Sequence, residues 1–136
     1  MVKDIIHDPI LLARKSENAT SSDIETAKNL LDTLTYNAES CVGMAANMIG
    51  VNKRIIVFAV EGGYMTMFNP VILKSSGPYE TEEGCLSLSG KRMTKRYKSI
   101  KVQYQTEDFK IRIKTFNGFT AQIIQHEIDH CNGILI

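Results

Sequence analysis

The stretch Gln125-His126-Glu127-Ile128-Asp129-His130, close to the carboxyl end of the 136-residue chain, predicts a helix and constrains the rest of the fold. It contains His-Glu-x-x-His, in which two histidines four positions apart lie one turn from each other on one helix face. Both imidazoles can then bind one divalent metal, with Glu127 beside them as a candidate base. Surface histidines on a solvated face are the alternative. The chain has only three histidines, and this helix is otherwise apolar, which favours a metal.

A catalytic zinc-type site needs three protein ligands and one open position. Only six residues follow His130, and Cys131, directly beside it, points around the helix. A third ligand is therefore expected from earlier in the chain. The best candidate is Cys85 in the motif Glu83-Gly84-Cys85-Leu86-Ser87, because a cysteine beside glycine in a loop or at a strand edge can approach a metal closely. Taken alone, Cys85 would be interpreted as a buried apolar thiol.

The amino-terminal half predicts one helix and a loop. Residues 14–21 are polar and indicate a surface loop. Residues 22–25 read as a capping box, and apolar residues recur at helical spacing behind it, so a helix is expected over residues 23–36. Residues 41–50 are rich in small residues and are expected to form a loop.

Strand patterns fill the middle of the chain. The apolar, β-branched run 54–60, a turn at 61–63 and residues 64–68 predict a hairpin. Further strands are expected at 71–73, 100–104 and 109–114, with a break at 75–78, a turn at 106–108 and a final helix from near 119 to a stop at 133. The order helix, many strands, helix predicts an α+β fold, mostly antiparallel β-sheet packed around the C-terminal metal-binding helix. Residues 1–136 are expected to form a single domain.

Composition excludes several classes of protein. Apolar residues make up 43% and charged residues 23% of the chain, and the net charge is +1, so no nucleic-acid or membrane surface is expected. The first residues lack a signal-peptide core, which predicts a cytoplasmic protein. The three cysteines match no disulfide framework and are expected to be free thiols, one or more of them available to a metal. The sequence gives no prediction for the oligomeric state.

The motif Glu83–Ser87 together with Gln125–His130 resembles the peptide deformylase family. That family has a further signature, Gly-x-Gly-Leu-Ala-Ala-x-Gln, and Cys41–Met48 is similar to it in order and spacing. The resemblance covers nearly the whole chain, from Asp8 to Gly133. The signature departs from the family pattern at Cys41, where the family has glycine, at Met44, where it has leucine, and at Met48, where it has glutamine.

The resemblance implies that Cys85, His126 and His130 bind one divalent metal ion, which in the family is natively Fe²⁺ with Zn²⁺ or Ni²⁺ able to substitute. A thiolate with two imidazoles suits zinc or a late first-row metal equally well. Glu127 would take the proton of a metal-activated water and deliver it to the leaving amine. The substrate would be the N-formylmethionyl end of a peptide or nascent chain, and the products formate and a free amine.

The family stabilises the oxyanion with the backbone N–H after the metal-binding cysteine, here Leu86, and with the signature glutamine. Methionine at position 48 donates no hydrogen bond. Losing one such donor typically slows turnover by ~10²–10³-fold, so a weakened activity is expected. Neither Asn47 nor Gln125 is expected to replace the missing donor.

The resemblance also assigns Val42, Gly43 and Met44 to a segment that pairs with the substrate backbone as an added strand. Met44, Ile124 and Ile128 are candidates for the wall of a methionine pocket, and equally for simple core. Arg96 is a candidate partner for Asp129, and His7 is expected to be solvated.

Two alternatives to a deformylase remain open at this point. The chain could keep the metal but bind or process a different substrate, which Cys41 and Met48 favour. It could also be an interaction domain with a structural metal; Glu127 argues against this, because a structural site needs no base and prefers four protein ligands.

Overall fold

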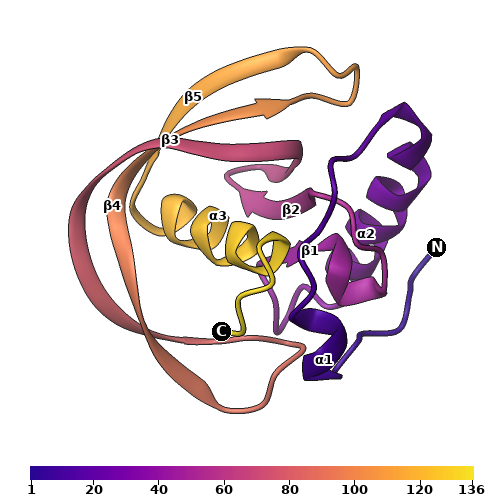
Figure 1. Cartoon of the computed structure of the whole chain (residues 1–136), viewed down its shortest axis with the longest axis horizontal. Coiled ribbons are helices and arrows are strands. Elements are labelled where there is room, and N and C mark those ends of the chain that lie inside the picture. Colours follow the sequence, from indigo (N-terminus) through magenta and orange to yellow (C-terminus); the bar gives the residue numbers. More distant parts are fainter.

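The computed structural model describes all 136 residues and arranges five strands in one antiparallel sheet in chain order (Figure 1). Helices precede and follow the strands, as the α+β prediction requires. The elements are α1 (Pro9–Leu12), the 3-10 helix η1 (Ser21–Asp23), α2 (Ile24–Tyr36), β1 (Gly43–Ala45), the 3-10 helix η2 (Ala46–Ile49), β2 (Ile55–Val60), β3 (Gly63–Gly84), β4 (Lys91–Gln105), β5 (Ile111–Asn117) and α3 (Gly118–Cys131). No helix in this set has the length and hydropathy needed to cross a membrane.

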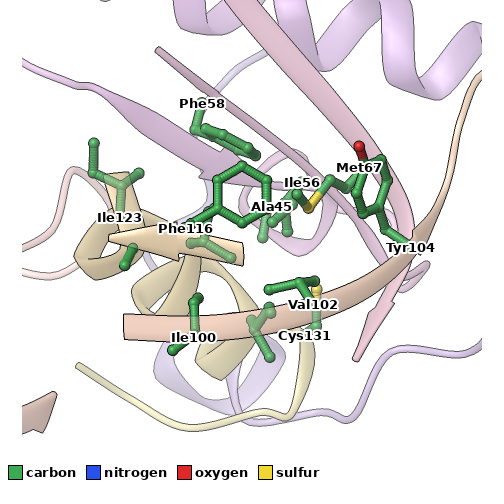
Figure 2. Close-up of a cluster of buried hydrophobic side chains, with 13 residues drawn as sticks. Ala45, Ile56, Phe58, Met67, Ile100, Val102, Tyr104, Phe116, Ile123 and Cys131 are labelled. Atoms are coloured by element: carbon green, nitrogen blue, oxygen red, sulfur yellow. The ribbon is translucent and has the colours of Figure 1, made fainter. Parts of the chain in front are cut away.

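Strand β2 is buried on both faces because a helix covers each of them. Its side chains alternate: Ile56 and Phe58 join a core cluster with residues of α3, whereas Ile55 and Val57 join a second cluster with residues of α2. Figure 2 shows the first cluster, in which Phe58 and Phe116 lie edge to face with ring centroids 6.4 Å apart. Such double coverage explains why this strand is continuously apolar in the sequence.

Helix α3 lies inside the curve that β3, β4 and β5 make around it (Figure 1). Nine of its residues are buried, including both histidines of the motif. The helix ends as predicted at Gly133, which has a φ of 74° and donates its N–H to the carbonyl of His130. A side chain at this position would also collide with the backbone of Ala13. The buried residues of α3 include the polar side chains Gln125, His126, Glu127 and His130.

The predicted break at residues 75–78 is wrong. Strand β3 continues through it, with Ser75 opposite Ile100, Ser76 opposite Ser99 and Pro78 opposite Tyr97. The reason is that β3 pairs with β2 only as far as Phe68 and has β4 as its sole neighbour beyond that point. A strand with one free edge tolerates a proline. The separate strands predicted at 71–73 and 100–104 are parts of the longer β3 and β4.

Three smaller predictions also need correction. The expected loop 41–50 contains β1 and η2, because Met44 pairs across the sheet with Val57, a long-range contact that local sequence does not reveal. The capping box lies earlier than predicted: the backbone N–H of Thr20 donates to the Asp23 carboxylate, and η1 precedes α2. Strand β5 begins at Ile111 rather than 109, and Phe116 is its only buried residue.

Candidate metal centre and active site

Three side chains converge at one point inside the molecule: Cys85, His126 and His130. The Nε2 atoms of the two histidines are 3.2 Å apart, and the Cys85 sulfur lies 3.3 Å from His130 Nε2. Two nitrogens bound to a single tetrahedral ion at about 2.0–2.1 Å lie roughly 3.3 Å from each other. The ligand atoms thus already have the spacing that one divalent ion requires.

Two parts of the fold, the helix α3 and the end of β3, position the three candidate ligands. The two histidines lie on successive turns of α3 and are both buried. Cys85 is the first residue after β3, where the chain leaves the sheet for the loop that leads to β4. The side-chain amide of Asn47 in η2 donates to the backbone carbonyl of His130 at 2.9 Å, so η2 is fixed against the end of α3. The end of β3, the helix α3 and the loop that follows Cys85 therefore meet at the three candidate ligands.

The pKa values of the two histidines are shifted in opposite directions. Burial opposes protonation of His126, but its hydrogen bonds to Cys85 and Glu83 outweigh burial and raise its pKa to about 10. Burial, and then the charge of His126, lowers the pKa of His130 to about 3. One proton therefore serves the pair where their Nε2 atoms meet. A divalent ion would displace it, because metal ligands bind in their deprotonated form.

Glu83 fixes the ring of His126 from the far side. Its Oε1 accepts from His126 Nδ1 at 2.8 Å, the arrangement in which a carboxylate orients a metal-binding imidazole. The same carboxylate accepts two hydrogen bonds from Arg96 and one from Gln122. Burial works against its charge, but these donors lower the pKa of Glu83 to about 2. Glu83 therefore stays ionised at any ordinary pH.

Arg96 links this carboxylate to the metal-motif helix. Its Nη1 donates to Asp129 Oδ2 at 2.6 Å, which confirms the predicted pairing of Arg96 with Asp129. Its Nε and Nη2 form the two-pronged contact with Glu83. Both hydrogen bonds raise the pKa of the buried guanidinium despite the opposing effect of burial. The cation therefore joins β3, β4 and α3 at a position directly behind His126.

Glu127 is the base candidate, and its carboxylate accepts no hydrogen bond from a protein side chain. The side chain is 4% exposed and lines the cavity beside the ligands, and its Oε1 has no hydrogen-bond partner in the protein. Burial, countered in part by His126, raises its pKa to about 7. A carboxylate with a raised pKa and an unoccupied oxygen is suited to accept and return a proton near neutral pH.

The cavity measures about 780 Å³ and opens over these residues, within the range typical of small-ligand sites. The loop after Cys85 forms part of its wall, and Leu86 lies there with its backbone N–H unused by any other group of the protein. That N–H is free to donate to a bound ligand. On the amino-terminal side, His7 also lines the cavity and contacts the carbonyl of Ser87 through Nδ1 at 2.9 Å, so it is exposed but not simply solvated.

The three residues predicted to pair with substrate divide into two groups. Val42 and Gly43 line the cavity, whereas the Met44 side chain is fully buried in the core on the α2 side. Ile124 and Ile128 likewise lie in the core, and it is their neighbour Ile123 that reaches the cavity. The apolar wall expected from Met44, Ile124 and Ile128 is therefore not formed by these side chains.

Two of the three departures from the signature, Cys41 and Met48, line the cavity. Met48 is buried, and its sulfur accepts from the backbone N–H of Ala45 at 3.5 Å, so its contact here is as an acceptor. Neither amide nearby can substitute for a donor. Asn47 is held by the His130 carbonyl, and Gln125 is bound to both the N–H and the carbonyl of Tyr97.

Sequence reasoning missed the contributions of Glu83 and Gln122. Glu83 stands inside the quoted motif, two positions before Cys85, and the rule that a metal-binding histidine donates its other N–H to a carboxylate could have identified it. Gln122 precedes His126 by four positions and so lies on the same helix face. No sequence signal gives the contact of His7 with Ser87, since it depends on the path of the amino-terminal segment across the cavity wall.

Comparison with known proteins identifies the family. A model described as polypeptide deformylase matches residues 3–136. The peptide deformylase of Clostridium beijerinckii is 57% identical over 136 residues, 100% of either chain. That of Carboxydothermus hydrogenoformans is 39% identical over 96% of this chain and 86% of its own.

Solved structures agree with the sequence matches. The class I type b peptide deformylase of Acinetobacter baumannii with Met-Ala-Ser bound has a TM-score of 0.89 at 28% identity, covering 99% of this chain and 97% of that one. The Thermotoga maritima peptide deformylase has a TM-score of 0.89 at 30% identity, covering 99% and 95%. Because the family model spans nearly the whole chain and a full-length relative is more than half identical, the chain belongs to the polypeptide deformylase family, whose members are hydrolases that remove the N-formyl group.

Proposed function

We propose that this protein hydrolyses the formamide bond of N-formylmethionyl peptides with one divalent metal ion, and that it does so more slowly than a family member with glutamine at position 48. The observation that carries the proposal is the convergence of Cys85, His126 and His130 beside a buried glutamate with a free oxygen. Glu127 is what separates this site from a structural metal site, which has no use for a base.

The residues would share the chemistry as follows. An ion held by the three ligands supplies Lewis-acid activation, lowering the pKa of a water and polarising a carbonyl. The Glu127 carboxylate would accept the proton of the attacking water and return it to the leaving amine. The free N–H of Leu86 donates to the oxygen on which negative charge develops at the formyl carbon. Formate and a peptide with a free amino terminus result.

Strand β1 supports a peptide as the substrate. It is the edge strand of the sheet, with β2 on one side only, and its first residue, Gly43, lines the cavity together with the preceding Val42. A free edge can accept an extended peptide as an added strand, which would provide main-chain hydrogen bonds independent of sequence. The A. baumannii relative holds a short peptide beginning with methionine. The main-chain N–H and C=O groups on the free edge of β1 support binding of a peptide to this chain as well.

Met48 accounts for the proposed loss of rate. The thioether is buried and has no proton to donate, so the oxyanion would rely on the ion and on Leu86. Replacing Met48 with glutamine should restore a donor and raise kcat, by up to ~10²–10³-fold if the amide reaches the oxyanion. Met48→Leu is the matched control, since it keeps an apolar side chain of similar size and should leave kcat unchanged.

The test measures formate and the newly freed amino group from formyl-Met-Ala with anaerobically purified protein, and acetyl-Met-Ala, whose hydrolysis would also free the amino group, is the comparison substrate. We expect slow release by the natural chain, faster release by Met48→Gln and none from the acetyl peptide. If neither the natural chain nor Met48→Gln releases formate when each carries an ion, the deformylase proposal fails. If the natural chain is as fast as Met48→Gln, the handicap assigned to Met48 is wrong.

A further inference from the structure

The carbonyl of Gly43 is directed away from the sheet. Strand β1 pairs Gly43 with Phe58, and directly before it the Ala59 N–H donates to the Val42 carbonyl at 2.8 Å, so Val42 and Ala59 form a hydrogen-bonded pair in the same register. Hydrogen-bonded and non-bonded pairs alternate along an antiparallel ladder, so the next pair, Gly43 with Phe58, is non-bonded. Both main-chain polar groups of Gly43 therefore face the free edge of β1, on the side of the cavity.

This free-edge acceptor is already in use. The Cys41 thiol donates to the Gly43 carbonyl at 3.0 Å, although β1 has no strand on that side. Cys41 itself lines the cavity together with Gly43 and Glu127. Burial, and then the negative charge of Glu127, raises the pKa of Cys41 to about 11. The sulfur accordingly keeps its proton at neutral pH and can act as a donor.

Glycine at position 43 is required by the same packing. A Cβ there would lie 2.7 Å from Ile123 Cγ2 and 2.9 Å from Glu127 Oε2. The acceptor is consequently held at a fixed place beside the base, and its distance from the reacting centre is set by the contact of β1 with α3. A main-chain group so placed is suited to align a peptide, and the residue that covers it controls access to it.

We propose that Cys41 is a positioning residue whose thiol covers the Gly43 carbonyl and must be displaced by a main-chain N–H of the peptide before β1 can pair with it. This inference rests on the proposed function, since it assumes that peptides bind along β1. A thiol suits the task because S–H is a weak donor. The thiol occupies the Gly43 carbonyl in the free protein. An amide N–H of the peptide is a stronger donor and can displace the thiol.

The hydrogen bond from the Cys41 thiol to the Gly43 carbonyl should affect the affinity for peptide and not the rate of the chemical step. A weak hydrogen bond of ~0.5–1 kcal/mol corresponds to about a twofold to fivefold change in affinity. We therefore expect Cys41→Ala, which uncovers the carbonyl, to lower KM by about that factor. Cys41→Ser replaces the thiol with a stronger hydroxyl donor and should raise KM above that of the natural chain. In both variants kcat should stay within about twofold.

The experiment measures KM and kcat for formyl-Met-Ala with the natural chain, Cys41→Ala and Cys41→Ser, after thermal melts establish that all three are folded. The dissociation constant of Met-Ala-Ser is measured by calorimetry on the same proteins, and should follow the same order: alanine tightest, serine weakest. Equal KM values in all three proteins, or an effect confined to kcat, would overturn the inference while leaving the proposed function intact. If no variant binds peptide or releases formate, the proposed function itself fails.

Infrared spectroscopy gives a readout independent of turnover. The S–H stretching band that disappears in Cys41→Ala belongs to this thiol, and hydrogen bonding to the Gly43 carbonyl lowers its frequency. Saturation with Met-Ala-Ser should move the band of the natural chain to higher frequency as the thiol is displaced. A band that stays in place at saturation would contradict the displacement of Cys41.

Discussion

Replacing Glu83 with glutamine is expected to weaken metal binding although the side chain touches no metal. The carboxylate receives four hydrogen bonds: two from Arg96, one from Gln122 and one from His126. A glutamine offers one acceptor oxygen in place of two and turns an NH₂ group toward the other donors. At least two donors would then lose their acceptor. At ~1–3 kcal/mol for each unsatisfied buried group, stability should fall by roughly 2–6 kcal/mol.

The effect on the metal follows from the contact with His126. Loss of the carboxylate removes the charge that orients the ring and makes Nε2 a better ligand. Residues in this position typically contribute 10–100-fold to metal affinity, which is about 1.4–2.8 kcal/mol. We expect Glu83→Gln to lower Zn²⁺ affinity by that factor, measured by competition with a chromogenic chelator at a temperature where circular dichroism shows the variant to be folded.

Glu82 provides the matched control. It is the neighbouring residue on the same strand, but its side chain is largely exposed and its only ion pair is a 3.9 Å contact with Lys91. Glu82→Gln should therefore leave both stability and Zn²⁺ affinity unchanged. If Glu83→Gln binds Zn²⁺ within twofold of the natural chain, the role given to Glu83 in holding His126 is wrong.

Three further predictions concern Arg96, Gly43 and removal of the metal ion. Arg96→Met should lower the free energy of unfolding by about 3–5 kcal/mol, because it leaves buried carboxylates unpaired, and should lower Tm by roughly 10–20 °C. Arg92 is exposed, so Arg92→Met should change Tm little. Equal melting curves for the two variants would refute the prediction. Gly43→Ala should lower stability by about 1–3 kcal/mol and should also reduce formate release, because the new Cβ would lie 2.9 Å from Glu127 Oε2. Gly63→Ala is the control, because Gly63 has open space around it. Chelation of the ion should lower Tm reversibly, since the ion binds only the folded chain; a Tm that ignores chelator and added Zn²⁺ would count against the site.

The metal-binding helix could be predicted in detail from the sequence because its signals are local. The spacing of His126 and His130, the glycine at 133 and the apolar residues between them act within a few turns of helix. The α2 helix and the hairpin turn at 106–108 were predictable for the same reason. Strand lengths were not, because the length of β3 depends on β4 as a partner and on the absence of β2 beyond Phe68.

The site could be predicted only as far as its motifs extend. The motifs supplied three candidate ligands and a candidate base; the structure brings Cys85, His126 and His130 together, with Glu127 in the wall of the adjoining cavity. The ion network around Arg96 required residues from three elements, of which only the contact with Asp129 was predicted. The cover of Gly43 by Cys41 had no sequence signal either, since it depends on which edge of β1 remains unpaired. The side chain of Met44 could be placed only from the structure, because strand alternation directs it into the core on the α2 side.

The measurement that tests the central claim most directly is metal content and formate release determined together for the natural chain and Glu127→Ala. The variant keeps Cys85, His126 and His130 but loses the glutamate that lines the cavity and whose Oε1 has no hydrogen-bond partner in the protein. We predict one ion per chain in both proteins and formate release from formyl-Met-Ala by the natural chain alone. Release by Glu127→Ala at the rate of the natural chain, or no release by a natural chain that carries a full complement of metal, would contradict the assignment of this site as a deformylase centre.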